Sequence, residues 1–183
     1  MTETTGGVTV ITPSLPGRTD FLYECRQSVS SQTVPVQHLV CLDERGEGPQ
    51  ALRNRLVAQA TTSWLLPLDD DDLLDPDCVE VLLERSEDAD VVYPFCRMDG
   101  RSDGWCPNRL FNARRLFRLN FIPNTALVRT DLFRLLGGYR KVQLEDWDLW
   151  QRAFLHGARF RCVPEVLWSY RFHEGNRFQA QAA

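Results

Sequence analysis

The sequence has no long apolar run. No stretch of about 18 consecutive apolar residues, the length that a transmembrane helix needs, occurs among its 183 residues. Segment 1–7 has neither a basic region nor an apolar core, so we expect no signal peptide. Together these two absences predict a cytoplasmic protein without a transmembrane segment.

Three other signatures are missing. The 6 cysteines are scattered without a C-x-x-C pair, which disfavours a zinc cluster and suits reduced thiols. No G-x-G-x-x-G follows the first apolar segment, so a dinucleotide fingerprint is not indicated. The net charge of −4 gives no general case for nucleic-acid binding.

Segments with a strand-like pattern alternate with segments of helical spacing. Strands are predicted at 8–11, 36–42, 64–68, 91–93, 125–128, 160–163 and 166–170. Helical spacing follows Thr19 and the loop 44–48, and further helices are predicted over 76–85, 131–136 and 145–156. This alternation predicts an α/β fold with right-handed βαβ units and a mostly parallel sheet. Segment 99–120 is expected to be a basic, loop-rich connection.

Four consecutive acids, Asp69–Asp72, follow the predicted strand 64–68. Without them the chain would carry 21 acidic and 21 basic residues, so its excess acidity lies in this run. Hard divalent cations prefer carboxylate oxygens, and open α/β sheets bind ligands beyond the carboxyl ends of their strands. The run therefore predicts a metal site. The alternative is an acidic helix start, with Asp75 as its cap and Pro76 at the first helical position.

Further motifs lie at the ends of predicted elements. They are Val10-Ile11-Thr12-Pro13-Ser14, Asp43, Gly137-Gly138-Tyr139, Leu144-Glu145-Asp146-Trp147 and Tyr170-Arg171-Phe172-His173. With the acid run, their order resembles the family 2 glycosyltransferases of the GT-A fold, over about residues 8 to 173. The resemblance implies a Rossmann-like α/β/α sandwich with a mixed, mostly parallel sheet. It also implies one domain over 1–183, with a nucleotide-sugar-binding half at 8–98, an acceptor-binding half at 99–176 and a tail at 177–183.

The resemblance implies a donor site for a nucleoside-diphosphate sugar. A UDP-sugar is favoured because Asp43 would accept a hydrogen bond from the N3–H of the base. The other nucleotide-site residues that the resemblance implies are Thr12, Pro13, Ser14, Arg18, Arg53, Asn54, Asp69 and Asp70.

A metal site and a catalytic base are implied as well. Asp71 and His173 would hold Mn²⁺ or Mg²⁺ against the diphosphate. Asp146 would take the proton of the acceptor hydroxyl, and Glu145 would orient the acceptor. Asp72 adjoins the next helix and is expected to be only structural. Direct displacement at C1 of the sugar predicts inversion of its configuration.

Three alternatives stay open. A sugar-phosphate nucleotidyltransferase should have a glycine-rich loop after its first strand, which segment 13–18 does not supply. A non-catalytic nucleotide-sugar-binding module need not keep both Asp71 and Asp146. A calcium-binding module is disfavoured because the acid run lacks the alternating acids of an EF-hand. The acceptor hydroxyl is unknown; a nucleic-acid acceptor is not indicated by the net charge, although the basic segment 99–120 leaves it open.

Overall fold

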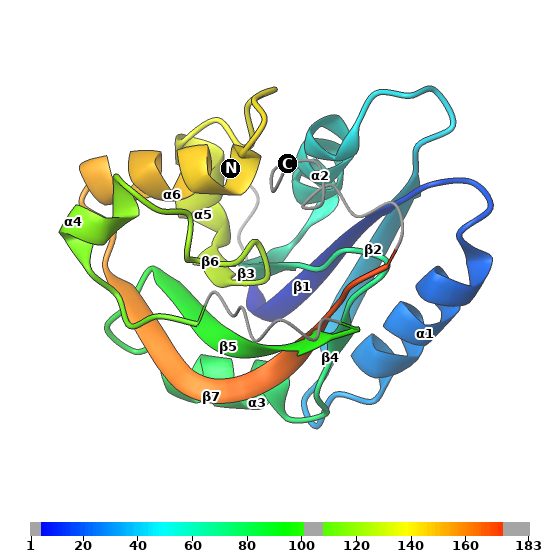
Figure 1. The fold of residues 1–183 in the computed structure, drawn as a ribbon, viewed down its shortest axis with the longest axis horizontal. Helices are drawn as coiled ribbons and strands as arrows, with labels where there is room; N and C mark the ends of the chain where they lie inside the picture. Colours follow the sequence, from blue (N-terminus) through cyan, green and yellow to red (C-terminus); the bar gives the residue numbers. More distant parts are fainter. Residues whose placement is uncertain (1–4, 101–107, 174–183) are drawn as a thin grey trace.

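A computed structural model describes residues 5–100 and 108–173 of the chain. Seven strands form one sheet in the order β2-β1-β3-β6-β5-β7-β4, with helices on both faces (Figure 1). The strands are β1 (Thr5–Ser14), β2 (Val36–Leu42), β3 (Thr62–Pro67), β4 (Leu73–Leu74), β5 (Val91–Asp99), β6 (Leu127–Arg129) and β7 (Phe160–Arg171). The pairs β1–β2, β1–β3 and β5–β7 are parallel, whereas β3–β6, β5–β6 and β4–β7 are antiparallel. The predicted mixed α/β/α sandwich is confirmed.

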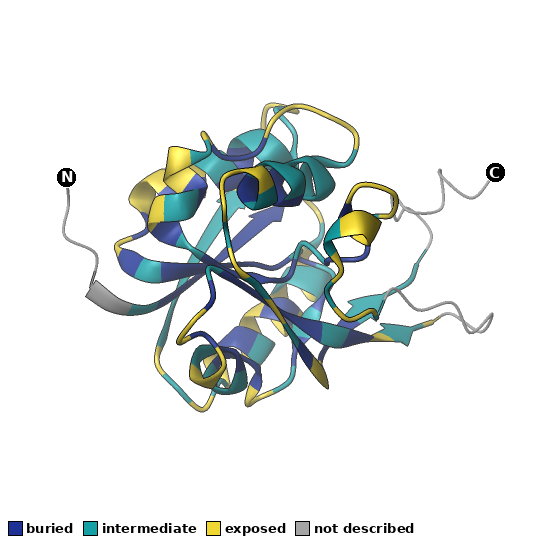
Figure 2. Cartoon of the chain, turned by 90° about the vertical axis from the view of Figure 1, so that its left-hand side faces the viewer, coloured by how far each residue is buried: buried dark blue, intermediate teal, exposed yellow. Residues whose placement is uncertain are grey.

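The helices divide between the two faces of the sheet. They are α1 (Thr19–Ser30), α2 (Pro49–Gln59), α3 (Cys78–Glu84), α4 (Ala113–Leu116), α5 (Thr130–Leu135) and α6 (Glu145–Leu155). One apolar core joins α1 and α3 to the sheet, through side chains such as Val29 and Leu82. The other joins α2, α4, α5 and α6 to it, around the fully buried Trp150. Figure 2 shows these buried positions concentrated in the strands and on the inner faces of the helices.

None of the helices in the described ranges combines the length and the apolar character that crossing a bilayer requires.

The predicted strands and helices occur in the structure. Their bounds differ from the prediction where contacts between elements determine them. Segments 160–163 and 166–170 form the single strand β7, because the register between β5 and β7 shifts at Pro94 and Phe95 instead of breaking. The predicted strand 91–93 extends to Asp99 because β7 pairs along its whole length. The short elements β4 and α4 were not predicted, since two and four residues are too few to show a period.

Both predicted helix caps are wrong by one or two positions. Thr19 is the first residue of α1, and Arg18 occupies its N-cap. The helix predicted from Pro76 begins at Cys78, after an N-cap at Asp77 that makes no side-chain capping bond. The carboxylate of Asp75 instead accepts a hydrogen bond from Arg97, at 2.8 Å. The acids of this segment therefore do not serve as the cap that the alternative reading proposed.

The topology collects the predicted motifs at one edge of the sheet. Strands β2, β1 and β3 run parallel, so their carboxyl ends meet, as the hydrogen bond from Asp43 N to the Ser14 carbonyl shows at 2.8 Å. The acid run follows β3, and the end of β7 brings His173 beside it. The start of α6 adds Glu145 to the same edge.

Candidate active site

A cavity of about 610 Å³ opens at this edge of the sheet. Its lining includes most of the residues that the resemblance implied for the nucleotide and the metal. They are Pro13, Ser14, Arg18, Asp43, Arg53, Asp69, Asp70 and Asp71. Glu145 and Asp146 line the same cavity, together with segment 118–125. The structure therefore brings the predicted donor and acceptor groups into one space.

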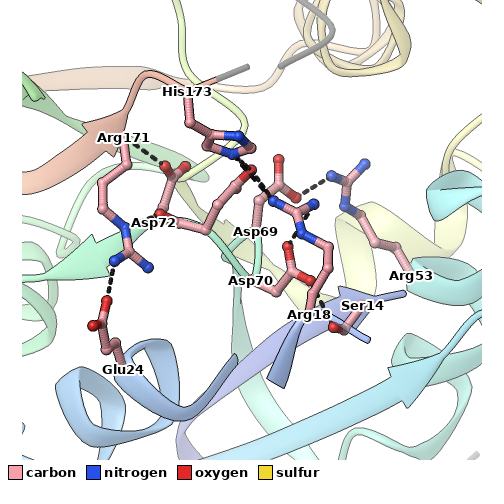
Figure 3. Close-up of polar contacts among 10 residues, drawn as sticks. Ser14, Arg18, Glu24, Arg53, Asp69, Asp70, Asp72, Arg171 and His173 are labelled. Atoms are coloured by element: carbon pink, nitrogen blue, oxygen red, sulfur yellow. Dashed lines mark hydrogen bonds and ion pairs between the residues drawn. The ribbon is translucent and has the colours of Figure 1, made fainter. Parts of the chain in front are cut away.

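The four acids of the run point in different directions. Asp70 turns back toward β1, where its carboxylate accepts a hydrogen bond from Ser14 Oγ at 2.6 Å and lies 3.1 Å from Arg18 Nη1 (Figure 3). It is 3% exposed, and burial raises its pKa against the opposing effect of these two partners. Asp70 thus holds the run against the first strand.

The other three acids form a cluster. Carboxylate oxygens of Asp69, Asp71 and Asp72 all lie within 4.8 Å of one another, and Asp71 Oδ2 lies 2.9 Å from Nε2 of His173. Burial raises the pKa of Asp72 well above its ordinary value, and the charges of its two neighbours raise it further. A divalent cation would relieve this repulsion, and three carboxylate oxygens suit Mn²⁺ or Mg²⁺. Asp72, expected to be only structural, lies in this cluster and also accepts the Arg171 N–H at 3.1 Å, which ties the acid run to the end of β7.

Arg18 reaches into this cluster from the N-cap of α1. Its Nη2 donates to Asp71 Oδ2 at 2.7 Å and lies 3.2 Å from Nε2 of His173. Its guanidinium also lies over the ring of Phe21, 5.1 Å from the centroid. The predicted metal residues Asp71 and His173 are therefore brought together, with a guanidinium beside them that offsets the charge of Asp71.

Arg53 connects the acid run to α6. It is 3% exposed, its Nη1 donates to Glu145 Oε1 at 2.8 Å, and its Nη2 donates to Asp69. Its guanidinium lies 5.3 Å from the ring centroid of Tyr139. The planar fork of arginine can serve two carboxylates at fixed angles. One buried side chain therefore fixes the first acid of the run relative to the start of α6.

Asp146 occupies the first turn of α6 on the far side of Arg53. Its Oδ1 accepts the Trp147 N–H at 2.8 Å, and Asn120 Nδ2 lies 3.2 Å from both of its carboxylate oxygens. Burial raises the pKa of Asp146 to about 6, whereas the hydrogen bond from Asn120 opposes that rise. A carboxylate with a pKa near neutrality suits general-base catalysis. Asn120 was missed because no motif or spacing distinguishes it in the sequence.

Two of the predicted nucleotide residues do not reach the cavity lining. Thr12 is 0% exposed, and its hydroxyl lies 2.9 Å from Nε2 of His38. The side chain of Asn54 donates to the carbonyl of Tyr139 and accepts from its N–H, both at 2.9 Å. Thr12 therefore ties β1 to β2, and Asn54 fixes the turn before α6. They hold the walls of the site.

Asp43 lines the cavity but is tied to the loop that follows it. Its two carboxylate oxygens accept the N–H groups of Gly48 and Glu47, both at 2.8 Å. These bonds lower its pKa and keep it ionised. Each carboxylate oxygen has a further lone pair, so Asp43 can still accept a hydrogen bond from a ligand.

Comparison with known proteins decides the family. The model of the family described as Glycosyl transferase family 2 matches residues 17–142. The chain belongs to that family. It is 29% identical over 164 residues to the succinoglycan biosynthesis protein ExoO of Rhizobium meliloti (strain 1021), covering 78% of this chain and 47% of that protein. The chain thus spans about half the length of this relative.

Solved structures confirm the GT-A fold of this family 2 domain. Residues 1–349 of S. aureus TarS, in complex with UDP-GlcNAc, match 95% of this chain and 61% of that one, with a TM-score of 0.77 and 17% identity. The mannosyltransferase PcManGT of Pyrobaculum calidifontis, with GDP-Man and Mn²⁺, matches 99% and 63%, with a TM-score of 0.72 and 13% identity. The family match ends before Glu145, Asp146 and His173, which the fold itself brings to the acid run.

Proposed function

We propose that this family 2 domain transfers a sugar from a nucleoside-diphosphate donor, a UDP-sugar, to an acceptor hydroxyl with inversion at C1. The observation that carries the proposal is the pairing of two sites within one cavity. The cluster of Asp69, Asp71 and Asp72 is suited to a diphosphate-bound cation. Asp146, with a pKa of about 6, lines the same cavity as a separate base.

The donor side has residues for each part of a nucleotide sugar. A bound Mn²⁺ or Mg²⁺ would supply positive charge against the departing diphosphate, and Asp71 and His173 would hold it with Asp69 and Asp72. Arg18 carries a further positive charge at the same place. Asp43 keeps an acceptor for the N3–H of uracil. The neighbouring structures with UDP-GlcNAc and with GDP-Man support a nucleoside-diphosphate donor as the class.

The acceptor side provides the base. Asp146 takes the proton from the acceptor hydroxyl as that oxygen forms its bond to C1 of the sugar. The bond from C1 to the diphosphate oxygen breaks at the same time, and the nucleoside diphosphate leaves with the electron pair. Glu145 is held by Arg53 at 2.8 Å, so it is positioned to orient the acceptor. Attack from the face opposite the leaving group inverts C1.

The nucleotidyltransferase alternative has no support in this site. Segment 13–18 contains one glycine, Gly17, and leads directly into α1. The glycine-rich phosphate loop that such an enzyme needs is therefore not formed there. The non-catalytic alternative is separated from transfer by experiment.

The test is a screen of nucleotide sugars for released nucleoside diphosphate, with Mn²⁺ or Mg²⁺ and then with EDTA. We expect release with a UDP-sugar that EDTA and Asp71→Ala abolish. Asp146→Asn should bind UDP as the wild type does but lose transfer. Asp77→Ala removes an exposed acid outside the cavity and serves as the matched control. Equal release in EDTA, or a product that keeps the donor's anomeric configuration, would refute this mechanism.

A further inference from the structure

Asn120 is the side chain that contacts both oxygens of the proposed base. Its Nδ2 lies 3.2 Å from Oδ1 and 3.2 Å from Oδ2 of Asp146. It also lines the cavity, in the segment between α4 and β6. An amide placed evenly between two carboxylate oxygens fixes the plane of the carboxyl group.

The two oxygens of Asp146 are not equivalent. Oδ1 accepts the Trp147 N–H at 2.8 Å in addition to the Asn120 amide. Oδ2 has the Asn120 amide as its partner among the described residues. Since Oδ1 has the stronger set of donors, a proton arriving at Asp146 is expected to bind Oδ2.

The other end of the Asn120 amide has no partner among the residues that the structure describes. Its Oδ1 is fully shielded from solvent and accepts no hydrogen bond. A buried acceptor without a donor costs free energy. The amide bears this cost while its Nδ2 stays on the Asp146 carboxylate.

We propose that Asn120 is a positioning residue for the general base, donating to both oxygens of the Asp146 carboxylate and so favouring its ionised form before transfer. This inference rests on the proposed function. The proton balance is complete: the acceptor hydroxyl loses its proton to Oδ2 of Asp146, and the Asn120 amide, which can still donate to Oδ1, neither gains nor loses one.

The charged groups around Asp146 act on its pKa in opposite directions. Glu145 precedes it on α6 and raises its pKa, whereas Arg53 on α2 lowers it. Tyr139, in the turn before α6, is neutral because burial raises the pKa of its phenol. Arg118 lines the same cavity from the segment that carries Asn120. Because Glu145 and Arg53 oppose one another, the largest influences on the pKa of Asp146 are burial, which raises it, and the hydrogen bond from the Asn120 amide, which lowers it.

Removing the amide should raise the pKa of Asp146 and so shift the acidic limb of the pH–rate profile to higher pH. A hydrogen bond to a charged group corresponds to roughly one pH unit. In Asn120→Ala, kcat/KM should therefore fall about fivefold near pH 6 and approach that of the wild type above about pH 8. Asn120→Asp places a second negative charge beside the base, so the acidic limb of this variant should lie at still higher pH.

The experiment measures kcat/KM for sugar transfer across pH in the wild type, Asn120→Ala and Asn120→Asp. Asn112→Ala is the matched control: Asn112 is the N-cap of α4, eight positions before Asn120, where its Oδ1 accepts the Arg115 N–H at 2.9 Å, and it lies outside the cavity lining. Its limb should coincide with that of the wild type. A ¹³C-carboxyl NMR titration of Asp146, assigned with Asp146→Asn, reads the same shift without any activity.

Each outcome has a separate meaning. An ordered rise of the limb from Asn to Ala to Asp, matched by NMR, supports the inference. A uniform loss of rate at every pH with an unmoved Asp146 titration overturns it and leaves the proposed function standing. A moved titration in a protein that transfers no sugar from any donor upholds the contact between Asn120 and Asp146 and overturns the proposed function. If Asn120→Ala does not fold, Asn120→Asp alone decides.

Discussion

Replacing Asp146 with asparagine should stabilise the fold while it abolishes transfer. Burial raises the pKa of Asp146 to about 6 from an ordinary value of 3.8. Because one pKa unit corresponds to about 1.4 kcal/mol, keeping the ionised carboxyl in the fold costs up to about 3 kcal/mol. Water in the open cavity screens part of this cost, so about 1–2 kcal/mol is expected. In Asp146→Asn that cost is absent.

The pH dependence fixes the sign of the effect. Below about pH 4 the carboxyl is protonated in both the folded and the unfolded chain, so wild type and variant differ little. Between about pH 4 and pH 6 the unfolded chain releases the proton first, and the wild type loses stability relative to Asp146→Asn. The difference should reach its full size above about pH 7.

Urea unfolding at several pH values measures this difference directly. Asp148→Asn, two positions further along α6, is the matched control: its carboxylate lies 2.7 Å from Arg152, so this change should destabilise the fold by about 0.3–0.5 kcal/mol. A variant of Asp146 that is no more stable than the wild type at pH 7.5 would refute the reasoning. A gain that does not change with pH would refute it equally, because the gain would then come from packing.

Three further predictions follow from the contacts of the site. Mn²⁺ should raise the Tm of the wild type, and Asp71→Ala should abolish that rise in calorimetry; an equal rise in the variant would place the ion elsewhere. Arg53→Leu removes the guanidinium shared by two acids and should cost about 3–5 kcal/mol in urea unfolding, whereas Arg55→Leu, whose partner is on the surface, should cost less than about 1 kcal/mol. Gly138→Ala should lower the free energy of unfolding by about 1–3 kcal/mol, because φ is +73° and the new Cβ would clash with Oδ1 of Asn54. Gly137→Ala has a similar φ of +76° but open space around its Cβ, so it should cost less. Equal losses in urea unfolding would show that the clash is not the cause.

The sequence predicted where the site lies because strand ends are local features. Parallel strands are apolar and β-branched, so the ends of β1, β2 and β3 can be read from composition, and with them Ser14, Asp43 and the acid run. The antiparallel strands β4 and β6 are two and three residues long and are set by their neighbours. The pairing of β4 with β7, which adjoins the acid run, could therefore not be predicted.

The turn that follows β3 determines which acids of the run lie in the cluster. In an extended strand successive side chains alternate between the two faces, which would place Asp70 and Asp72 together. The Asp72 N–H instead donates to the Asp69 carbonyl at 3.1 Å, and this turn brings Asp72 round to Asp69 and Asp71. Asp70 instead contacts Ser14 and Arg18. These contacts are distant in the sequence, so no local pattern could predict them.

Arg53 joins the two parts of the cavity that we propose for the donor and the acceptor. Asp69 begins the acid run after β3, and Glu145 begins α6; the guanidinium of Arg53 on α2 contacts both. That guanidinium is almost fully buried, so displacing either acid would leave a charge of the trio without its partner in a poorly solvated place. A ligand that shifts Asp69 therefore acts on the helix start that carries Asp146. Strands β5 and β7 pair along their length across the proposed boundary between the two halves, so the framework beneath them is one continuous sheet. The cavity is thus a single unit, in which a ligand bound at the acid run would bear directly on the position of Asp146, the base that we propose.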